Sequence, residues 1–365
     1  MNKNYIVLDL EWNQGNPKTE LSEIPFEIVE IGAVKLNSNH EIIDTFERLI
    51  RPQIYTKMHF ATRKLIHLTT RDLENEDIFP LVYEEFLKWC GEDFIFCTWG
   101  TQDLQELQRN IRFYILPPLG DRPFPYLDVQ KLFSLAKEDG KSRRSLEYAV
   151  DFMGLQKKDA FHRAENDAVY TAEILQEIAQ KKLEERVSFD VFHLPKSPAE
   201  ELHVTFDTYS KYISRAFPDK SSVMRDKEAT SCRCYLCNKD TRHNIDWFSA
   251  SSKYYLFLGT CKDHGPMRGK LRIKKSEDGN IYVVKTIRRA TEEDITKLKE
   301  KAEKAHLAAQ KAALYRAHEN SSHSEKTDQD NSKATSHPHK EEMKANKPAS
   351  KKQGSKNSKS KKTGS

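Results

Sequence analysis

The chain has 365 residues, of which 37% are hydrophobic and 32% charged, and its formal net charge at pH 7 is +5. The apolar share is below the roughly 45–50% of an average globular protein, so we expect part of the chain to stay outside a packed core. No run approaches the ~18 consecutive apolar residues of a membrane-spanning helix, and six cysteines are too few for a disulfide-built fold. The length allows two or three domains. The amino-terminal segment lacks the apolar stretch of a secretion signal, so we expect a cytoplasmic protein without a membrane partner.

The net positive charge comes entirely from residues 319–365. This segment holds 11 Lys, no Arg and 6 acidic residues, whereas residues 1–318 hold 49 basic and 49 acidic residues. A polar, Lys-rich segment cannot bury enough apolar surface to offset its ordering entropy, so we expect a disordered tail. Two functions are open for it: a weak electrostatic tether for nucleic acid, or a solubilising tail with no specific partner.

The first 185 residues alternate short apolar strands with amphipathic helices. The predicted strands cover residues 5–9, 28–36, 42–50 and 94–99. The predicted helices cover residues 80–90, 101–110, 127–137, 145–152 and 163–180. This order predicts an α/β fold in which helices flank a mixed sheet.

The pattern changes after residue 185. Residues 186–225 have no clear periodicity, and we expect them to act as a connector. Residues 226–290 contain four of the six cysteines and two predicted strands, 254–259 and 281–287. Residues 291–318 form a predicted long helix, since Thr291 and Asp294 resemble a capping box.

Asp9 and Glu11 lie two positions apart at the end of the first predicted strand. Side chains alternate across a strand, so both carboxylates project from the same face. Neighbouring carboxylates raise each other's pKa, and a divalent cation between them removes their repulsion. Oxygen ligands of this kind suit Mg²⁺ or Mn²⁺. Such pairs are common on strands, so the metal interpretation depends on further residues.

Two later segments supply those residues. Asp103 falls in the first turn of a predicted helix, where the helix dipole also tolerates a carboxylate for structural reasons alone. His162 precedes the helix predicted over residues 163–180, and Asp167 lies on that helix. A histidine in this place can also be an ordinary exposed loop residue. The ordered set is more specific than any of its members.

The segments around these residues resemble the three exonuclease motifs of the DEDDh 3′–5′ exonucleases, which have a ribonuclease H-like fold. The segments are VLDLEWN at 7–13, EIVEIGAVKLN at 27–37, CTWGTQDL at 97–104 and FHRAENDA at 161–168. They are similar in particular to the enhanced-RNAi exonucleases and to the bacterial KapD-like exonucleases. The resemblance covers roughly residues 1–185. It implies RNA as the favoured substrate, approached through a single-stranded 3′ end.

A two-metal mechanism explains the residue types. Asp9 would bridge two ions, Glu11 and Asp167 would complete the shell of one, and Asp103 would act on the other. His162 would be the general base that takes the proton from the attacking water, since an ordinary histidine pKa of about 6.5 suits that role. The products would be nucleoside 5′-monophosphates.

Three residues near the first motif are candidates for contact with the substrate. Trp12 and Asn13 directly follow the acidic pair, and Phe26, which has less support, directly precedes the segment at 27–37. An aromatic ring can stack on a terminal base of any identity. Alternatively, Trp12 only covers the sheet.

A second set of ligand-type side chains lies in the carboxy-terminal half. Cys234 and Cys237 form a C-x₂-C pair, and Cys261 and His264 form a C-x₂-H pair 24 positions later. Four such ligands suit a structural Zn²⁺, which predicts a small zinc-ribbon-like module at residues 226–290. Thiols without metal and a redox role stay open, and Cys232 is a spare thiol. Basic and aromatic residues interleave along this module, so it either binds nucleic acid or has a solvated basic face.

The leading interpretation is a metal-dependent 3′–5′ exonuclease acting on RNA, with an accessory zinc module. One alternative keeps the reaction but makes DNA the substrate. The other is a nucleic-acid-binding regulator in which the nuclease domain is only a scaffold. The complete set of five motif residues argues against that second alternative. The sequence does not fix the oligomeric state.

Overall fold

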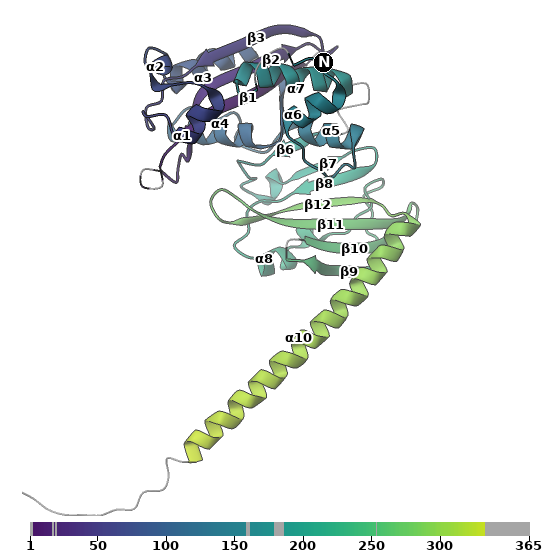
Figure 1. Ribbon diagram of the computed structural model, residues 1–365. Helices are drawn as coiled ribbons and strands as arrows, with labels where there is room; N and C mark the ends of the chain where they lie inside the picture. Colours follow the sequence, from purple (N-terminus) through teal and green to yellow (C-terminus); the bar gives the residue numbers. More distant parts are fainter. Residues whose placement is uncertain are drawn as a thin grey trace, which may run out of the picture. The chain divides into compact units, whose positions relative to one another are not determined.

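The computed structural model describes residues 3–16, 18, 20–157, 161–178, 186–252 and 254–332, with the side chains of 316–332 left aside. The chain divides into two compact units, residues 1–305 and 306–365. The first unit holds two separate six-stranded sheets (Figure 1). No helix of the described residues is both long enough and apolar enough to span a membrane.

The first sheet has the strand order β3-β2-β1-β4-β5-β6. Its strands are β1 (Asn4–Gln14), β2 (Phe26–Leu36), β3 (Ile42–Leu49), β4 (Phe94–Thr98), β5 (Phe124–Asp128) and β6 (Ser188–Asp190). β1 pairs parallel to β4, and β4 pairs parallel to β5, whereas the other pairs are antiparallel. The carboxyl ends of β1, β4 and β5 therefore meet at one edge of the sheet, where open α/β sheets usually carry their sites.

Helices cover both faces of this sheet, which confirms the expected α/β architecture. On one face, α3 (Phe79–Cys90) and α4 (Gln102–Phe113) pack against the even-numbered apolar residues of β1. On the other, α5 (Val129–Lys137), α6 (Leu146–Met153) and α7 (Ala164–Ile178) pack around Val7. Two short helices, α1 (Phe60–Ile66) and α2 (Thr70–Leu73), flank a small cluster beside β2. Side-chain alternation along β1 then turns Asp9 and Glu11 to the face of Val7, which α7 covers.

Gly32 on β2 lets the start of α7 approach the sheet. A Cβ at this glycine would lie 2.0 Å from the carbonyl carbon of Ala164 and 2.1 Å from the backbone nitrogen of Glu165. Gly32 is also the cross-strand partner of Asp9. The missing side chain at Gly32 thus brings the amino-terminal turn of α7 against the strand that carries the acidic pair.

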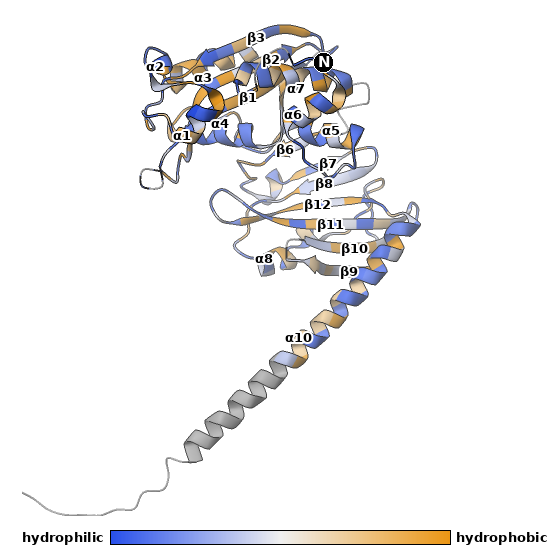
Figure 2. Ribbon diagram, in the orientation of Figure 1, coloured by the Kyte–Doolittle hydropathy of each residue, from blue (hydrophilic) through white to orange (hydrophobic). Residues whose placement is uncertain are grey.

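The second sheet is antiparallel throughout, with the order β7-β8-β12-β11-β10-β9. Its strands are β7 (Leu202–Thr205), β8 (Tyr209–Ile213), β9 (Arg242–Ser251), β10 (Tyr254–Cys261), β11 (Gly265–Lys275) and β12 (Ile281–Arg289). A 3₁₀ turn (Pro198–Glu200) precedes it, and α8 (Lys220–Arg225) and α9 (Lys227–Thr230) join the core on one of its faces. Hydrophobic and hydrophilic residues alternate along β11 (Figure 2). β10 is instead buried over four consecutive residues, 256–259, and its Leu256 and Leu258 pack against Ile295 and Leu298 of the last helix.

The last helix, α10 (Glu292–Ser332), begins with the expected capping box. The Asp294 carboxylate accepts a hydrogen bond from the Thr291 backbone N–H at 3.1 Å, and the Thr291 hydroxyl accepts one from the Asp294 N–H at 3.1 Å. The helix runs past residue 318, where we expected a disordered tail to follow, because extending an existing helix needs no new nucleus. The remaining tail, residues 333–365, lies outside the described residues.

Residues 186–225 are the clearest departure from expectation. We expected a connector, but they form β6 of the first sheet and β7 and β8 of the second. The expected ribbon-like module of residues 226–290 is accordingly part of a larger sheet. These strands are three to five residues long and mostly half-exposed, so they lack the apolar run that would reveal them in the sequence.

We predict that Gly32→Ala destabilises the protein by about 1–3 kcal/mol or more, because the new methyl group meets backbone atoms that cannot rotate away. Denaturant unfolding followed by circular dichroism measures the loss. Gly120→Ala is the matched control, since the nearest atom to its new methyl group would be a Phe124 ring carbon at 3.5 Å, an ordinary contact. Equal stability of the two variants would contradict the proposed close approach.

Candidate active site

Three of the five expected acidic-site residues meet directly at the carboxyl edge of the first sheet. Possible ligand atoms of Glu11, His162 and Asp167 all lie within 4.8 Å of one another. Asp9 and Asp103 lie beside them, since the charges of Asp103, Asp167 and Glu11 each act on the Asp9 carboxylate. The structure therefore brings together side chains from β1, α4 and α7 that are far apart in the chain.

Burial and mutual repulsion raise the pKa values of the two carboxylates on β1. For Asp9, burial is the largest cause of a pKa well above the usual 3.8, and the charge of Asp103 adds most to it. For Glu11, burial and then the charge of Asp167 raise the pKa to about 8. Without a cation, this group of carboxylates therefore holds protons near neutral pH.

The pKa values of the two carboxylates on helices are also raised, and backbone hydrogen bonds oppose this increase. Burial raises the pKa of Asp103 to about 7, although hydrogen bonds from its own backbone and from that of Leu10 lower it. Burial raises the pKa of Asp167 to about 6 against a hydrogen bond from the His162 backbone N–H. That bond, to Asp167 Oδ2, is 3.3 Å long.

One carboxylate oxygen of the site has no hydrogen-bond donor among the described residues. Asp167 Oδ1 is buried, and no described residue donates a hydrogen bond to it. A buried carboxylate oxygen without a donor is costly unless a cation meets it. Oxygen donors crowded in this way fit Mg²⁺ or Mn²⁺, so the residues present match the expected metal site.

The segment that carries His162 is fixed to the sheet by its neighbour. Arg163 binds the buried Glu30 of β2, with Nε 3.0 Å from Oε1, and its Nη2 lies 2.8 Å from Oε1 of Glu47 on β3. His162 itself is exposed and has φ 66°, a left-handed conformation that is uncommon for a non-glycine residue. Glu30 was not among the site residues predicted from the sequence. Its position opposite Glu11 across the β1–β2 pair could have drawn attention to it.

Of the three expected substrate contacts, the structure gives Asn13 a different function. Its side chain is fully buried, donates to the carbonyls of Tyr55 (2.7 Å) and Lys57 (3.1 Å), and accepts from the His59 N–H at 2.9 Å. Asn13 thus holds the loop before α1, and its amide has no free group for a substrate. A register shift between Glu11 and Trp12 turns it away from the surface.

Trp12 and Phe26 remain compatible with substrate contact. Both are half-buried, and their ring centroids are 5.6 Å apart across the β1–β2 pair. Trp12 also packs against the core beneath it. The pair forms a partly exposed aromatic surface, and Trp12 directly follows Glu11 in the chain.

The second expected metal site is also assembled. Ligand atoms of Cys234, Cys237, Cys261 and His264 all lie within 4.8 Å of one another. The Sγ atoms of Cys237 and Cys261 are 3.7 Å apart, and His264 Nδ1 lies 3.6 Å from Cys234 Sγ and 3.7 Å from Cys261 Sγ. Tetrahedral zinc, with Zn–S of about 2.3 Å and Zn–N of about 2.0–2.1 Å, separates such atoms by about 3.6–3.8 Å.

The pKa values of two of these cysteines are shifted in opposite directions. Burial raises the pKa of Cys234, although backbone hydrogen bonds at Cys237 and Leu236 oppose the increase. Burial raises the pKa of Cys261, but backbone N–H groups of Asp263 and His264 and the His264 side chain outweigh it and lower the pKa to about 6. Cys232 lies outside the cluster: burial raises its pKa to about 12, and its thiol donates to the Thr230 carbonyl. Cys90 and Cys97 are buried in the first domain, as expected for core thiols.

Three basic residues of this module, for which nucleic-acid contact and a solvated face were both open, hold the second sheet together. The Lys285 ammonium is buried and donates to the carbonyls of Glu228 (2.6 Å) and Ser231 (3.0 Å). Arg268 and Arg288 both bind Asp294 at the start of α10. These three side chains are therefore structural, which narrows any binding surface to the remaining basic residues.

Comparison with known proteins places this site in a family. Residues 6–175 match the profile of the exonuclease family (RNase T), a range that includes all five residues of the acidic site. Residues 6–175 are therefore an exonuclease domain of this family.

Individual proteins are also similar to this chain. Human 3′-5′ exoribonuclease 1 is 23% identical over 195 residues, which cover 50% of this chain and 54% of the relative. The PolC-type DNA polymerase III of Clostridium perfringens is 26% identical over 188 residues, 51% of this chain and 12% of the relative. The solved nuclease domain of 3′hExo, described as a DEDDh family member bound to rAMP, is 22% identical and covers 51% of this chain and 96% of that one, with a TM-score of 0.44. The chain spans about half the length of the exoribonuclease relatives it matches.

We predict that the metal-free protein loses stability as pH rises from about 5 to 8. The folded state holds protons on Glu11, Asp103 and Asp167 up to pKa values of about 8, 7 and 6, while the unfolded state releases them at the usual values of 4.5 and 3.8. Folding in that window therefore takes up protons, and its free energy weakens with rising pH. Thermal melts in EDTA measure the slope, which should be shallower in Asp167→Asn.

Mn²⁺ should restore stability, and more so at pH 8 than at pH 5. Asp93→Asn, an exposed carboxylate before the amino end of β4 and thus at the opposite sheet edge, is the matched control and should keep the wild-type slope. A pH slope that is the same in both variants would show that the acidic cluster is not its source.

Proposed function

We propose that this protein is a metal-dependent 3′–5′ exonuclease of the DEDDh type that removes nucleoside 5′-monophosphates from single-stranded RNA. The observation that carries the proposal is the convergence of Glu11, His162 and Asp167, with Asp9 and Asp103 beside them, in an exonuclease domain. The intact site supports catalysis over a purely scaffolding domain.

The four carboxylates and the histidine of the acidic site would have different roles in this reaction. Asp9, Glu11, Asp103 and Asp167 would hold Mg²⁺ or Mn²⁺, which when bound supplies an activated water and charge compensation at the phosphate. His162 accepts the proton of the attacking water on a ring nitrogen, from an exposed position within reach of Glu11. Asp167 fixes the His162 backbone through the 3.3 Å hydrogen bond.

Further groups would place the substrate. Arg163, bound to Glu30 and Glu47, keeps the His162 segment on the sheet. The Trp12–Phe26 surface would stack against the terminal base, a contact worth about 1–3 kcal/mol that tolerates every base. DNA is the second candidate substrate, because the PolC-type DNA polymerase is among the relatives. Competition between matched RNA and DNA strands at one salt concentration separates the two.

For the second sheet, we propose a structural Zn²⁺ on Cys234, Cys237, Cys261 and His264. The sulfur–sulfur and sulfur–nitrogen distances support tetrahedral coordination, and the lowered pKa of Cys261 supports a thiolate. Such an ion would join the turn after α9 to the end of β10. It would contribute to folding rather than to the reaction.

We predict that Asp167→Asn abolishes RNA shortening without unfolding the domain, because the change removes a ligand charge from a site that the sheet itself builds. A 5′-labelled single-stranded RNA incubated with Mg²⁺ or Mn²⁺ shows shortening from the 3′ end, and EDTA should stop it. The control Asp93→Asn should cut at the wild-type rate. Shortening by Asp167→Asn at that rate would refute the assignment of the site.

His162→Ala should lower turnover by a factor of about 10²–10⁴, the usual contribution of a general base, while RNA binding stays near normal. Single-turnover rates and filter binding measure the two quantities separately. His306→Ala on α10 is the matched control, since its side chain is also exposed. A wild-type rate in His162→Ala would remove this residue from the role of base.

The zinc proposal predicts one Zn²⁺ per chain, lost in Cys261→Ser together with thermal stability. Elemental analysis and melting curves measure both. Cys232→Ser is the control: its thiol is outside the cluster, and a serine hydroxyl can still donate to Thr230. Zinc content that falls equally in both variants, or is absent from the wild type, would contradict the proposal.

A further inference from the structure

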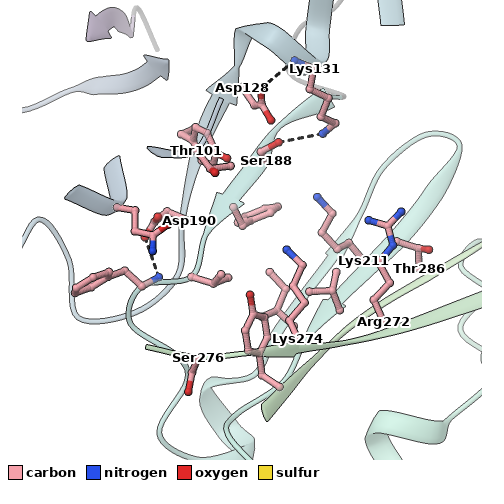
Figure 3. Close-up of a pocket in the computed structure, with 18 of the residues that line it drawn as sticks. Thr101, Asp128, Lys131, Ser188, Asp190, Lys211, Arg272, Lys274, Ser276 and Thr286 are labelled. Carbon is pink, nitrogen blue, oxygen red and sulfur yellow. Dashed lines mark hydrogen bonds between the residues drawn. The ribbon is translucent and has the colours of Figure 1, made fainter. Parts of the chain in front are cut away.

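A cavity of about 640 Å³ lies between the exonuclease domain and the second sheet. Its walls come from α4, β5, α5 and β6 on one side and from β8, β11 and β12 on the other. Figure 3 shows Lys211, Arg272 and Lys274 on strands of the second sheet, facing the strands that carry Asp128 and Ser188. We call this cavity the interdomain cleft.

Six cationic residues line the interdomain cleft, contributed by both of its walls. Five of them carry the argument, namely Lys131, Arg143, Lys211, Arg272 and Lys274, and the sixth is Lys275. On the second sheet, the strand register explains why they share a face. The even-numbered residues of β11 project from the face opposite to that of Leu271, whose side chain is buried in an apolar cluster. Lys211 of β8 lies opposite Thr286 of β12, which in turn lies opposite an even-numbered residue of β11, so Lys211 projects from the same face.

The acidic residues of the cleft are already engaged elsewhere. Asp128 caps α5 by accepting from the Lys131 backbone N–H at 2.9 Å. Asp190 accepts from Gln108 Nε2 at 2.9 Å and from the Phe192 N–H at 3.1 Å. Glu277 binds Arg109 on α4, with both distances 3.0 Å. The charge of Asp128 still acts on Lys131 and Arg143 and offsets them in part, whereas no carboxylate acts on Lys211 or Lys274.

The positive charges consequently face one another. Among the described residues, no carboxylate lies within 4.0 Å of a side-chain nitrogen of these five cations. Burial and then the charges of Lys131, Lys274 and Arg272 lower the pKa of Lys211 to about 7. An anion in the cleft would relieve this repulsion, as a divalent cation would at the acidic site.

The cleft adjoins the acidic site through α4. Thr101 and Gln105 line the cleft, and Asp103 stands between them in the chain on the other side of the same helical turn. The turn after β11 is fixed to α4 by Glu277, which accepts from Gln105 Nε2 at 2.8 Å and binds Arg109. A chain whose end lies at Asp103 could therefore pass over the first turn of α4 into the cleft.

We propose that the interdomain cleft binds the phosphate backbone of single-stranded RNA upstream of the 3′ end held at the acidic site. This inference rests on the proposed function and extends it. Positive charges on both walls of the cleft fit an extended RNA strand better than they fit a single small anion. The half-buried Phe189 and Tyr209 also line the cleft and offer rings to the bases between phosphates.

The test is RNA binding by the full chain carrying Lys211→Ala, Arg272→Ala and Lys274→Ala together. Fluorescence anisotropy with a labelled single-stranded RNA is recorded in EDTA over a range of salt concentrations. We expect the affinity at low salt to fall about tenfold or more. The slope of log affinity against log salt should become shallower by about 2, since each phosphate contact on a single strand contributes about 0.7.

The matched control replaces three exposed cations outside the cleft: Arg71→Ala, Lys88→Ala and Lys227→Ala. Its affinity and slope should stay at wild-type values. An unchanged slope in the cleft variant, or an equal loss in the control, would overturn the proposal. Melting curves establish that each variant is folded, and the single change Lys274→Glu replaces the triple variant if that one unfolds.

Two further measurements keep the outcomes distinct. Cleavage of a mononucleotide p-nitrophenyl ester, which reaches only the acidic site, should be unaffected in the cleft variant, while the KM for a long RNA rises. If the wild type cleaves neither substrate, the proposed function fails while the binding result still decides the cleft. If inorganic phosphate stabilises the wild type but not the variant and RNA affinity is unchanged, the cleft belongs to small anions and the proposal is overturned.

Discussion

Four carboxylates that repel one another, two of them buried and two half-buried, are the constraint on which the exonuclease domain depends. Asp9, Glu11, Asp103 and Asp167 share one sheet edge, and burial together with their mutual charge raises their pKa values. Such a group is costly in a folded protein unless protons or cations neutralise it. The unpartnered Asp167 Oδ1 shows where that neutralisation is incomplete. The fold itself therefore holds these carboxylates in an arrangement that metal binding would stabilise.

The rest of the domain holds these groups in place. Gly32 allows the backbone of α7 to approach the strand opposite Asp9, and the Arg163–Glu30 pair fixes the segment before α7. Hydrophobic packing on both faces then keeps β1 and the two helices from moving apart. The interdomain cleft shows the opposite case, because there the uncompensated charge is positive. The two sites lie on either side of the first turn of α4. An anionic strand with bound cations would therefore neutralise the negative charge of the acidic site and the positive charge of the cleft.

Much of the first domain could be predicted from the sequence, because the evidence was local. Period-two alternation placed Asp9 and Glu11 on one face, and the order of motifs identified Asp103, His162 and Asp167 as one site. The spacing of Cys234, Cys237, Cys261 and His264 likewise anticipated a cluster that the structure assembles. Features that depend on distant partners were not accessible. Asn13 was expected to touch substrate, yet three backbone groups of a later loop surround it. The connector at 186–225 proved to be strands of both sheets, and the cleft exists only because those sheets face each other.

The central claim is that the acidic cluster binds divalent cations in exchange for protons. Titration of Mn²⁺ into the full chain by calorimetry, in two buffers of different ionisation enthalpy, tests it most directly. The account predicts binding with release of protons to the buffer at pH 7, because Glu11 and Asp103 have pKa values of about 8 and 7. Asp167→Asn should lose this binding, and Asp93→Asn should keep it. Absence of Mn²⁺ binding in the wild type, or binding that Asp167→Asn retains unchanged, would contradict the account.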